Sequence, residues 1–118
     1  MSTTMLDVPT DHYIGGERVA SAQRFPTVTP YTQEMIAEVS RAGEAEVDRA
    51  VRAAHDAFPA WAALGATARA AHLHRLADLI DANLERLAAV ESADMAMLLR
   101  SLRARVIARG ALNYRNYA

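Results

Sequence analysis

The pattern of apolar and polar positions changes its period at Gly43. Before this residue, short β-prone runs are separated by turn residues, which is typical of strands. After it, apolar residues recur at intervals of three and four, which is typical of amphipathic helices. The pattern predicts an α+β chain in which two short N-terminal β-hairpins are followed by three to four α-helices.

The first hairpin is predicted around a pair of glycines. Residues 12–14 lead into Gly15-Gly16, and residues 17–19 continue beyond the pair. A Gly-Gly pair between β-prone runs favours a two-residue turn, because both turn positions need a positive φ. Residues 1–11 show no periodicity and are expected to be a disordered lead-in, and residues 12–118 are expected to be the structured segment.

The second hairpin is predicted from residues 25–29 and 35–40, joined by a turn over residues 30–34. Pro26 and Pro30 have no N–H to donate to a neighbouring strand. The first of these two strands is therefore restricted to a sheet edge or to a short stretch.

The first helix is expected to begin just after Gly43. Glu44 and Glu46 lie in its first turn, where negative side chains suit the helix dipole. Pro59 is expected to end the helix near Phe58, because proline cannot continue the backbone hydrogen-bond pattern. One apolar stripe runs along the helix, consisting of Val47, Ala50, Val51, Ala54, Phe58 and Trp61.

Two more helical regions follow. Thr67 is a candidate N-cap for the second helix, and Asn83 is a candidate break within it. The second region has its own apolar stripe, consisting of Leu73, Leu76, Ala77, Ile80, Leu84, Leu87 and Ala88. These stripes are as broad as those of a packed core, whereas the predicted sheet is small. Other structure is therefore expected to cover them.

The third helical region is expected over residues 97–118. Gly110 lies inside it and lowers the helix propensity by about 1 kcal/mol relative to alanine. Helical spacing predicts one face that carries Leu99, Leu102, Val106, Gly110, Asn113 and Tyr117, with Arg105, Arg109 and Asn116 beside it.

Composition removes several kinds of chemistry. The 118 residues include no cysteine and no lysine, which excludes thiolate metal sites, a thiol nucleophile and a Schiff-base amine. The glycines do not form the G-x-G-x-x-G pattern of a dinucleotide loop. No apolar run approaches the roughly 20 residues of a membrane span. Residues 1–13 lack the features of a secretory signal, so a cytoplasmic location is expected.

The positive charge is concentrated after Asp94. The formal net charge is −1, yet the five charged residues beyond Asp94 are all arginines. A basic helix can bind nucleic acid through phosphates, and it can equally face an acidic neighbour or an anionic substrate. Nucleic acid is the least favoured partner, because Leu98, Leu102 and Val106 interleave with the arginines. These arginines are Arg100, Arg103, Arg105, Arg109 and Arg115.

Four segments in a fixed order carry a family resemblance. They are YIGGERV at 13–19, FPTVTPYTQEMIAEV at 25–39, the run at 48–61 that ends in AFPAW, and RLADLIDAN at 75–83. Together they resemble the N-terminal portion of NAD(P)-dependent aldehyde dehydrogenases, over about residues 12–118. The resemblance implies an oligomeric enzyme that oxidises an aldehyde through a cysteine thiohemiacetal and passes hydride to NAD or NADP.

The resemblance implies that this chain is an incomplete part of such an enzyme. The nucleotide-binding core, the catalytic cysteine and the assisting glutamate belong to parts of the family that follow this segment. We therefore expect no catalytic residue, no bound cofactor and no activity in this chain alone. The full-length form is expected to oxidise a carboxylate-bearing semialdehyde, with a role in aromatic catabolism. A non-catalytic interaction module is the alternative, as is a split-enzyme subunit that binds the missing remainder or a homologous subunit.

Two sets of candidate site residues follow from the resemblance. Arg109 and Asn113 occupy positions at the entrance of the substrate tunnel, where an arginine can bind a carboxylate through two hydrogen bonds. A solvated or interface arginine is the other interpretation of Arg109. Thr27, Val28 and Asp94 match residues that hold a structural monovalent cation in many members, with a further ligand beyond this segment.

Three departures from the family pattern are visible. Thr29 stands where the family has asparagine before Pro30, and Gln33 stands where it has the turn glycine. Residues 95–97, Met-Ala-Met, replace a stretch similar to Gly-Lys-Pro. Because this last change removes a helix-breaking glycine, the helices on either side are expected to fuse or shift.

Overall fold

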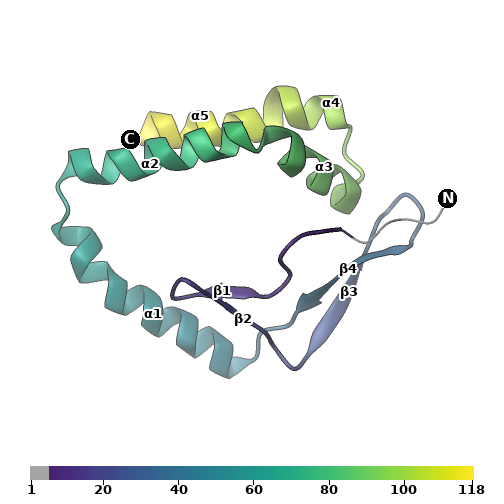
Figure 1. Cartoon of the computed structure of the whole chain (residues 1–118), viewed down its shortest axis with the longest axis horizontal. Helices are drawn as coiled ribbons and strands as arrows, with labels where there is room; N and C mark the ends of the chain where they lie inside the picture. Colours follow the sequence, from purple (N-terminus) through teal and green to yellow (C-terminus); the bar gives the residue numbers. More distant parts are fainter. Residues whose placement is uncertain (1–5) are drawn as a thin grey trace. The chain divides into compact units, whose positions relative to one another are not determined.

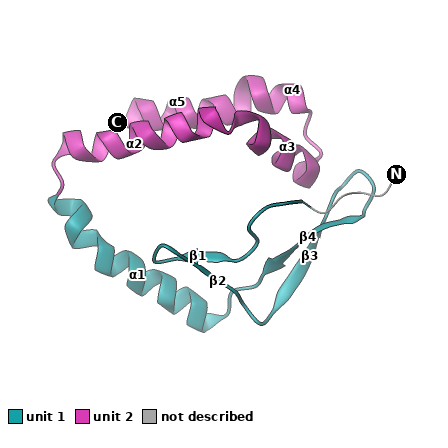
Figure 2. Ribbon diagram, viewed as in Figure 1, with its two compact units in different colours: residues 1–63 teal, residues 64–118 magenta. Residues whose placement is uncertain are grey.

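A computed structural model describes residues 6–118. The chain divides into two compact units, residues 1–63 and 64–118 (Figure 2). The first unit holds both hairpins and one helix, and the second is entirely helical (Figure 1). This order confirms the predicted α+β class, with the two hairpins preceding the helices.

The first hairpin consists of β1 (His12–Ile14) and β2 (Glu17–Val19), which pair antiparallel. Gly15 and Gly16 have φ values of 61° and 88°, which confirms the predicted two-residue turn. A Cβ built on Gly15 would lie 3.6 Å from the Cβ of Ala53, so this turn lies beside the first helix.

The second hairpin consists of β3 (Arg24–Val28) and β4 (Met35–Ser40), again antiparallel. Within residues 6–118, β3 has a neighbouring strand, β4, on one side only, and Pro26 pairs with Glu38 of β4. Pro26 therefore lies in an edge strand, as predicted. The turn holds Gln33 at a φ of 61°, a left-handed conformation that suits the glycine of the family pattern.

The residues before β1 run beside the second hairpin. The N–H of Leu6 donates to the carbonyl of Ile36 over 2.8 Å, and the N–H of Ser40 donates to the carbonyl of Thr10 over 3.0 Å. Ile36, which accepts the first of these hydrogen bonds, is fully buried. The expected disordered lead-in falls partly on residues 1–5, which lie outside the described residues.

Helix α1 (Glu44–Ala63) begins where the change of period predicts. Its N-terminus is capped by Glu46, whose Oε2 accepts a hydrogen bond from the N–H of Gly43 over 2.7 Å. The expectation that Pro59 ends the helix near Phe58 is wrong, because α1 continues to Ala63 with the proline inside it. Pro59 removes only the hydrogen bond to the carbonyl of His55, and His55 is exposed, so water can satisfy that carbonyl.

Helices α2 (Ala66–Ala82) and α3 (Leu84–Met95) meet at Asn83, which confirms the predicted break. The side-chain amide of Asn83 donates to the carbonyl of Leu79 over 2.8 Å. The expectation that Thr67 caps α2 is wrong, because the helix begins one residue earlier and the extended Gly65 precedes it. No side-chain cap hydrogen bond forms at Gly65, and the Arg69 guanidinium donates to the carbonyl of Leu64 just before the helix.

The helices on either side of Met95-Ala96-Met97 do not fuse, so that part of the expectation is wrong. Ala96 adopts a left-handed conformation with a φ of 54° and ends α3. The hydroxyl of Ser92 donates to the carbonyl of Met97 over 2.8 Å, which closes the turn. Ala96 thus ends the helix in a left-handed conformation that a glycine would adopt with less strain.

The last helical run consists of α4 (Leu99–Ser101), a π-helical turn η1 (Leu102–Val106) and α5 (Ile107–Tyr117). Gly110 does not interrupt it. Figure 1 shows α5 lying alongside α2, in agreement with their contacts. No helix among the described residues is long and apolar enough to cross a membrane.

Small side chains allow α2 and α5 to approach closely. Ala77 of α2, Ala111 of α5 and Leu102 of η1 are fully buried. In contrast, α1 buries none of its residues, and its apolar stripe includes Phe58, which is 65% exposed, and Trp61, which is 42% exposed. The second unit thus has a core of its own, whereas the stripe of α1 is largely uncovered.

Candidate functional site at the C-terminal helix

Arg109 and Asn113 lie one turn apart on α5, and both are exposed. Beside Arg109 is a shallow surface groove of about 300 Å³. It is lined by the apolar side chains of Ala104, Ala108 and Leu112 and by two arginines, Arg105 and Arg109. The structure therefore places one of the two predicted tunnel residues at a groove.

The π-helical turn before α5 decides which way these side chains point. The N–H of Ile107 donates to the carbonyl of Leu102, five residues earlier instead of four. In an uninterrupted α-helix, Arg109 would lie within about 20° of Leu102 around the axis, because seven residues make almost two turns. Leu102 is fully buried against the other helices. Arg109 would then face the same helices.

The extra residue in the wide turn rotates everything after it by about 100°. Arg109 and Asn113 move to the exposed side, and Ala111 moves to the buried side. The expectation that Leu102, Asn113 and Tyr117 share one face is therefore wrong. It assumed a constant period of 3.6 residues, and no glycine or proline in residues 102–106 signals the change.

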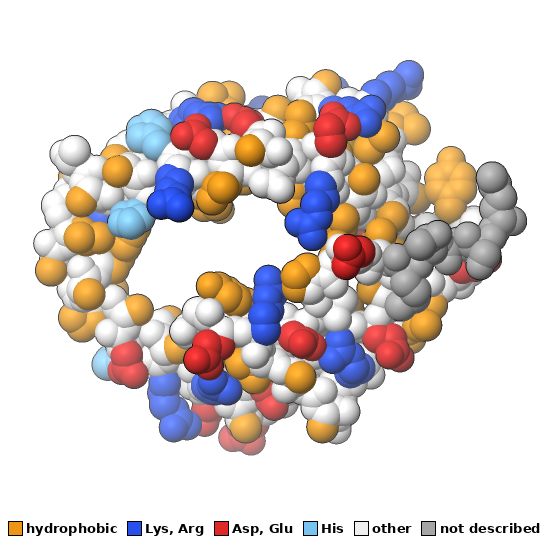
Figure 3. All heavy atoms as spheres, viewed as in Figure 1, with side chains coloured by type: hydrophobic (Ala, Val, Ile, Leu, Met, Phe, Trp, Pro, Cys, Tyr) orange, Lys and Arg blue, Asp and Glu red, His pale blue; other side chains and the backbone are white. Residues whose placement is uncertain are grey.

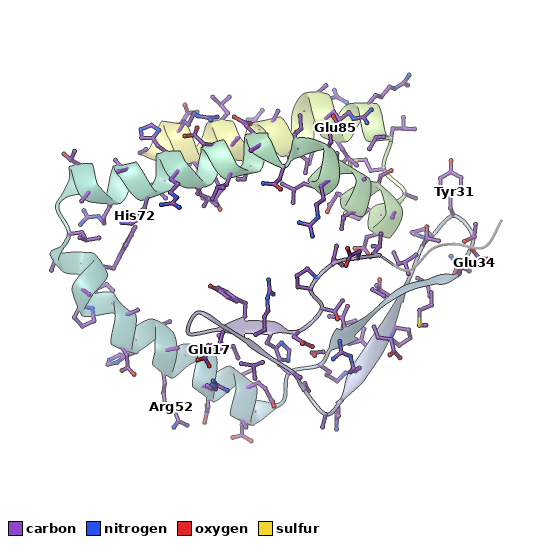
Figure 4. The ribbon with its side chains drawn as sticks, in the orientation of Figure 1. Glu17, Tyr31, Glu34, Arg52, His72 and Glu85 are labelled. Carbon is purple, nitrogen blue, oxygen red and sulfur yellow. The ribbon has the colours of Figure 1, made fainter. Side chains whose placement is uncertain are left out.

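Ion pairs connect η1 to α3 and α5 to α2. Arg115 of α5 contacts Asp78 and Asp81 of α2 at 2.7 Å each. Arg103 of η1 pairs with Glu85 of α3, which is labelled in Figure 4. Hydrogen bonds to the two aspartates raise the pKa of Arg115 above its ordinary value, and the bond to Asp78 has the larger effect. Arg103 and Arg115 thus have structural partners.

Arg105 and Arg109 differ from these two arginines. Neither forms a salt bridge within residues 6–118, and both side chains are exposed. Figure 3 shows that basic and acidic side chains are otherwise interspersed along the helices of the visible face. Within the described part of the chain neither guanidinium group has a carboxylate partner, and such groups can bind an organic anion.

The predicted cation residues lie in both units. Thr27 and Val28 belong to β3, where the strand pairing shifts register between them. Asp94 lies in the last turn of α3 and is exposed. No cluster of three or more histidine, cysteine or acidic residues that could hold a metal ion occurs within residues 6–118. The monovalent cation site, whose ligands would include backbone oxygens, stays a prediction.

Two carboxylates in the first unit have altered acidity. Arg24, whose Nη1 lies 2.9 Å from Asp11 Oδ1, and the hydroxyl of Ser40 lower the pKa of Asp11. The N–H of Gly43 lowers the pKa of Glu46. Asp11 joins the residues before β1 to β3 and β4, and Glu46 caps α1, which fits a structural role for both.

The glycines do not fit a dinucleotide cofactor. Gly15 and Gly16 form the turn of an antiparallel hairpin, whereas a dinucleotide loop connects a parallel strand to the N-terminus of a helix. Both sheets within residues 6–118 are antiparallel pairs. Within residues 6–118, the glycines therefore do not form a loop of this kind.

Comparison with known proteins identifies the class. Residues 18–118 match the aldehyde dehydrogenase family, so the chain belongs to this family. The segments at 43–51 and 54–64 and the run to Ala118 predict a resemblance to 5-carboxymethyl-2-hydroxymuconate semialdehyde dehydrogenase. This is confirmed, because the chain is 40% identical to that enzyme of Escherichia coli over 108 residues, 92% of this chain and 23% of the relative.

Other relatives agree with this result. The 2-aminomuconic semialdehyde dehydrogenase of Danio rerio is 38% identical over all of this chain and 24% of its own length. The structure of HpcC from Thermus thermophilus superposes with a TM-score of 0.90 at 41% identity, over 94% of this chain and 22% of HpcC. PnpE in complex with nicotinamide adenine dinucleotide gives 0.89 at 36% identity, over 92% of this chain and 23% of PnpE. The chain spans about a quarter of the length of these relatives.

Proposed function

We propose that this chain is part of an aldehyde dehydrogenase that oxidises a carboxylate-bearing semialdehyde to the acid with NAD or NADP. The observation that carries the proposal is the 40% identity to a muconate-type semialdehyde dehydrogenase over 92% of the chain. A role in aromatic catabolism and a cytoplasmic location are part of the same proposal. The chain alone is proposed to be inactive, because it contains no cysteine to form the thiohemiacetal.

In this proposal Arg109 holds the carboxylate end of the substrate. A guanidinium group binds a carboxylate through two parallel hydrogen bonds, which fix its orientation as well as its position. Asn113 lies one turn further along α5, and its amide can donate one more hydrogen bond. The carboxylate is thereby held at α5 and the aldehyde end is left free for catalytic groups supplied by the rest of the enzyme.

A second candidate is a non-catalytic or split-enzyme subunit that binds a partner chain. The exposed apolar stripe of α1 supports it, because Val51, Phe58 and Trp61 are each more than 40% exposed. The partner in this case is the remainder of a dehydrogenase or a homologous subunit. Family membership is common to both candidates, which differ in whether the remainder belongs to the same polypeptide.

The two candidates are separated by reading the gene beyond codon 118 and by an activity assay. In the assay, NAD(P)H formation from a carboxylate-bearing semialdehyde is measured for the chain alone and for the chain fused to, or mixed with, the remaining part of the Escherichia coli relative. We expect no activity alone and activity after fusion. Activity after mixing would favour a split enzyme. Turnover by the isolated chain, or an inactive but folded fusion, would contradict the proposal.

A further inference from the structure

Residues 6–11 form a strap along the outer edge of β4, the edge that faces away from β3. The N–H of Leu6 donates to the carbonyl of Ile36 over 2.8 Å, and the N–H of Ser40 donates to the carbonyl of Thr10 over 3.0 Å. The two segments run parallel, because the later residue of the strap bonds to the later residue of β4. The strap therefore lies beside β4 on the side opposite to β3.

The strap bonds to backbone groups that β4 would otherwise present at an open edge. In an antiparallel pair, the backbone groups of successive residues point alternately toward the partner strand and away from it. Those of Ile36 and Ser40 bond to the strap, so those of Glu38, midway between them, also point away from β3. The carbonyl of Glu38 accepts a hydrogen bond from Nη2 of Arg24 over 3.0 Å. The strap and Arg24 thus occupy this edge together.

The Arg24 guanidinium also holds the strap in place. Its Nη1 lies 2.9 Å from Oδ1 of Asp11, and its Nη2 donates to the hydroxyl oxygen of Thr10 over 2.6 Å. Asp11 accepts a further hydrogen bond from the hydroxyl of Ser40 over 3.2 Å. The side chains of Arg24 and Asp11 are only 32% and 36% exposed, so solvent screens this ion pair less than a pair at the open surface.

An uncovered strand edge is a template for pairing with another chain, and proteins often cover such an edge with a loop. β4 is suited to this pairing, because it contains the β-branched residues Ile36 and Val39. We propose that the strap, held by the Asp11–Arg24 ion pair, prevents a second copy of this chain from pairing with the outer edge of β4. Arg24 reaches this edge and offers an opposite charge to Glu38, the only charged residue of β4, in the second copy.

Amide hydrogen exchange in the 118-residue chain tests the ion pair. The Ser40 N–H reports release of the strap because it donates to Thr10, whereas the Arg41 N–H donates to Gln23 and reports opening of the hairpin itself. Asp11→Asn removes the charge that Arg24 holds. It should speed exchange of the Ser40 amide about fivefold or more and leave that of Arg41 unchanged.

Arg49→Gln is the matched control for this measurement. It breaks an ion pair between α1 and Glu17 of β2, outside the strap, and should change neither amide. An unchanged Ser40 amide in Asp11→Asn, or an equal acceleration in both variants, would overturn the role of the ion pair.

Sedimentation velocity over a range of chain concentrations tests the covered edge. Deletion of residues 1–10 removes all of the strap except Asp11, and deletion of residues 1–5 leaves the strap in place as the control. We expect the first chain to self-associate more strongly than the second. Adding Glu38→Pro to the first chain should reverse this, because proline has no N–H to donate at the outer edge.

The Arg41 amide shows whether the hairpin is intact in each chain. If proline opens the hairpin, Glu38→Lys gives the same test, because it places a like charge near Arg24 of the second copy. Association through the exposed stripe of α1 would not depend on residue 38. Equal association of the two shortened chains, or association that neither substitution reduces, would overturn the covered edge. These outcomes are independent of the proposed function.

Discussion

The N–H of Ile107 donates to the carbonyl of Leu102, five residues earlier, and this wide turn sets the direction of every later side chain in the helix. Leu102 before the turn and Ala111 after it are both fully buried. In a regular α-helix they would lie on opposite sides, because nine residues make two and a half turns. The wide turn lets both face the neighbouring helices.

Deletion of Ala104 is expected to be tolerated. It removes the extra residue, so a regular α-helix would keep Leu102 and Ala111 on the buried side. The free energy of unfolding from urea denaturation should fall by less than about 1 kcal/mol. Deletion of Ala71, in the regular helix α2, would rotate the residues before it by about 100° relative to those after it. It should lower the free energy of unfolding far more. An equal loss of unfolding free energy in both variants would show that the wide turn η1 does not arise from one extra residue.

Ala96→Gly should stabilise the chain by about 1 kcal/mol, because the left-handed conformation strains an alanine and not a glycine. Ala89→Gly, an exposed position inside α3, is the matched control. It should destabilise by about 1 kcal/mol, since glycine lowers helix propensity there. Thermal unfolding measures both. A lower melting temperature for Ala96→Gly would count against the left-handed cap.

Stability is expected to fall on acidification. The pKa values of Asp11 and Glu46 are lowered from ordinary values of 3.8 and 4.5, by Arg24 with Ser40 and by the N–H of Gly43, respectively. Their contribution is complete above the ordinary values and is lost as the pH falls through the lowered ones. Urea midpoints between pH 6 and pH 2 should show this decline, and Glu46→Gln should make it shallower. A midpoint that rises on acidification would contradict the assignment.

Arg115→Gln should loosen α5 from α2. Arg115 holds both Asp78 and Asp81, which would repel each other once the guanidinium is removed. Hydrogen exchange of the α5 amides should accelerate, and part of the loss should be recovered in high salt, which screens the repulsion. Arg100→Gln provides the control, with no ion pair of Arg100 formed within residues 6–118. Equal exchange rates in both variants would show that the ion pairs of Arg115 do not hold α5 against α2.

Local chemistry made much of the fold predictable. The Gly15-Gly16 turn, the Asn83 break and the start of α1 each depend on residues whose backbone preferences act within a few positions. The continuation of α1 through Pro59 was not predictable, because a single lost hydrogen bond near a helix end can be satisfied by water.

The candidate site was predictable only in part. The family resemblance singled out Arg109 and Asn113, and the structure places them on the exposed side of α5. Arg105 was assigned no role, because its relation to the groove depends on the helix surface around Ala108 and Leu112. The wide turn at η1 was missed, since packing of Leu102 and Ala111 against other helices, and not a local motif, accounts for it.

The proposed role of Arg109 as the anchor of a substrate carboxylate is tested most directly by kcat/KM of the fusion with the remainder of the Escherichia coli relative. Succinate semialdehyde and butanal have the same four-carbon chain and differ in one terminal carboxylate. We predict that Arg109→Ala lowers kcat/KM for succinate semialdehyde about tenfold or more and changes that for butanal little. Equal losses for the two aldehydes would contradict the account.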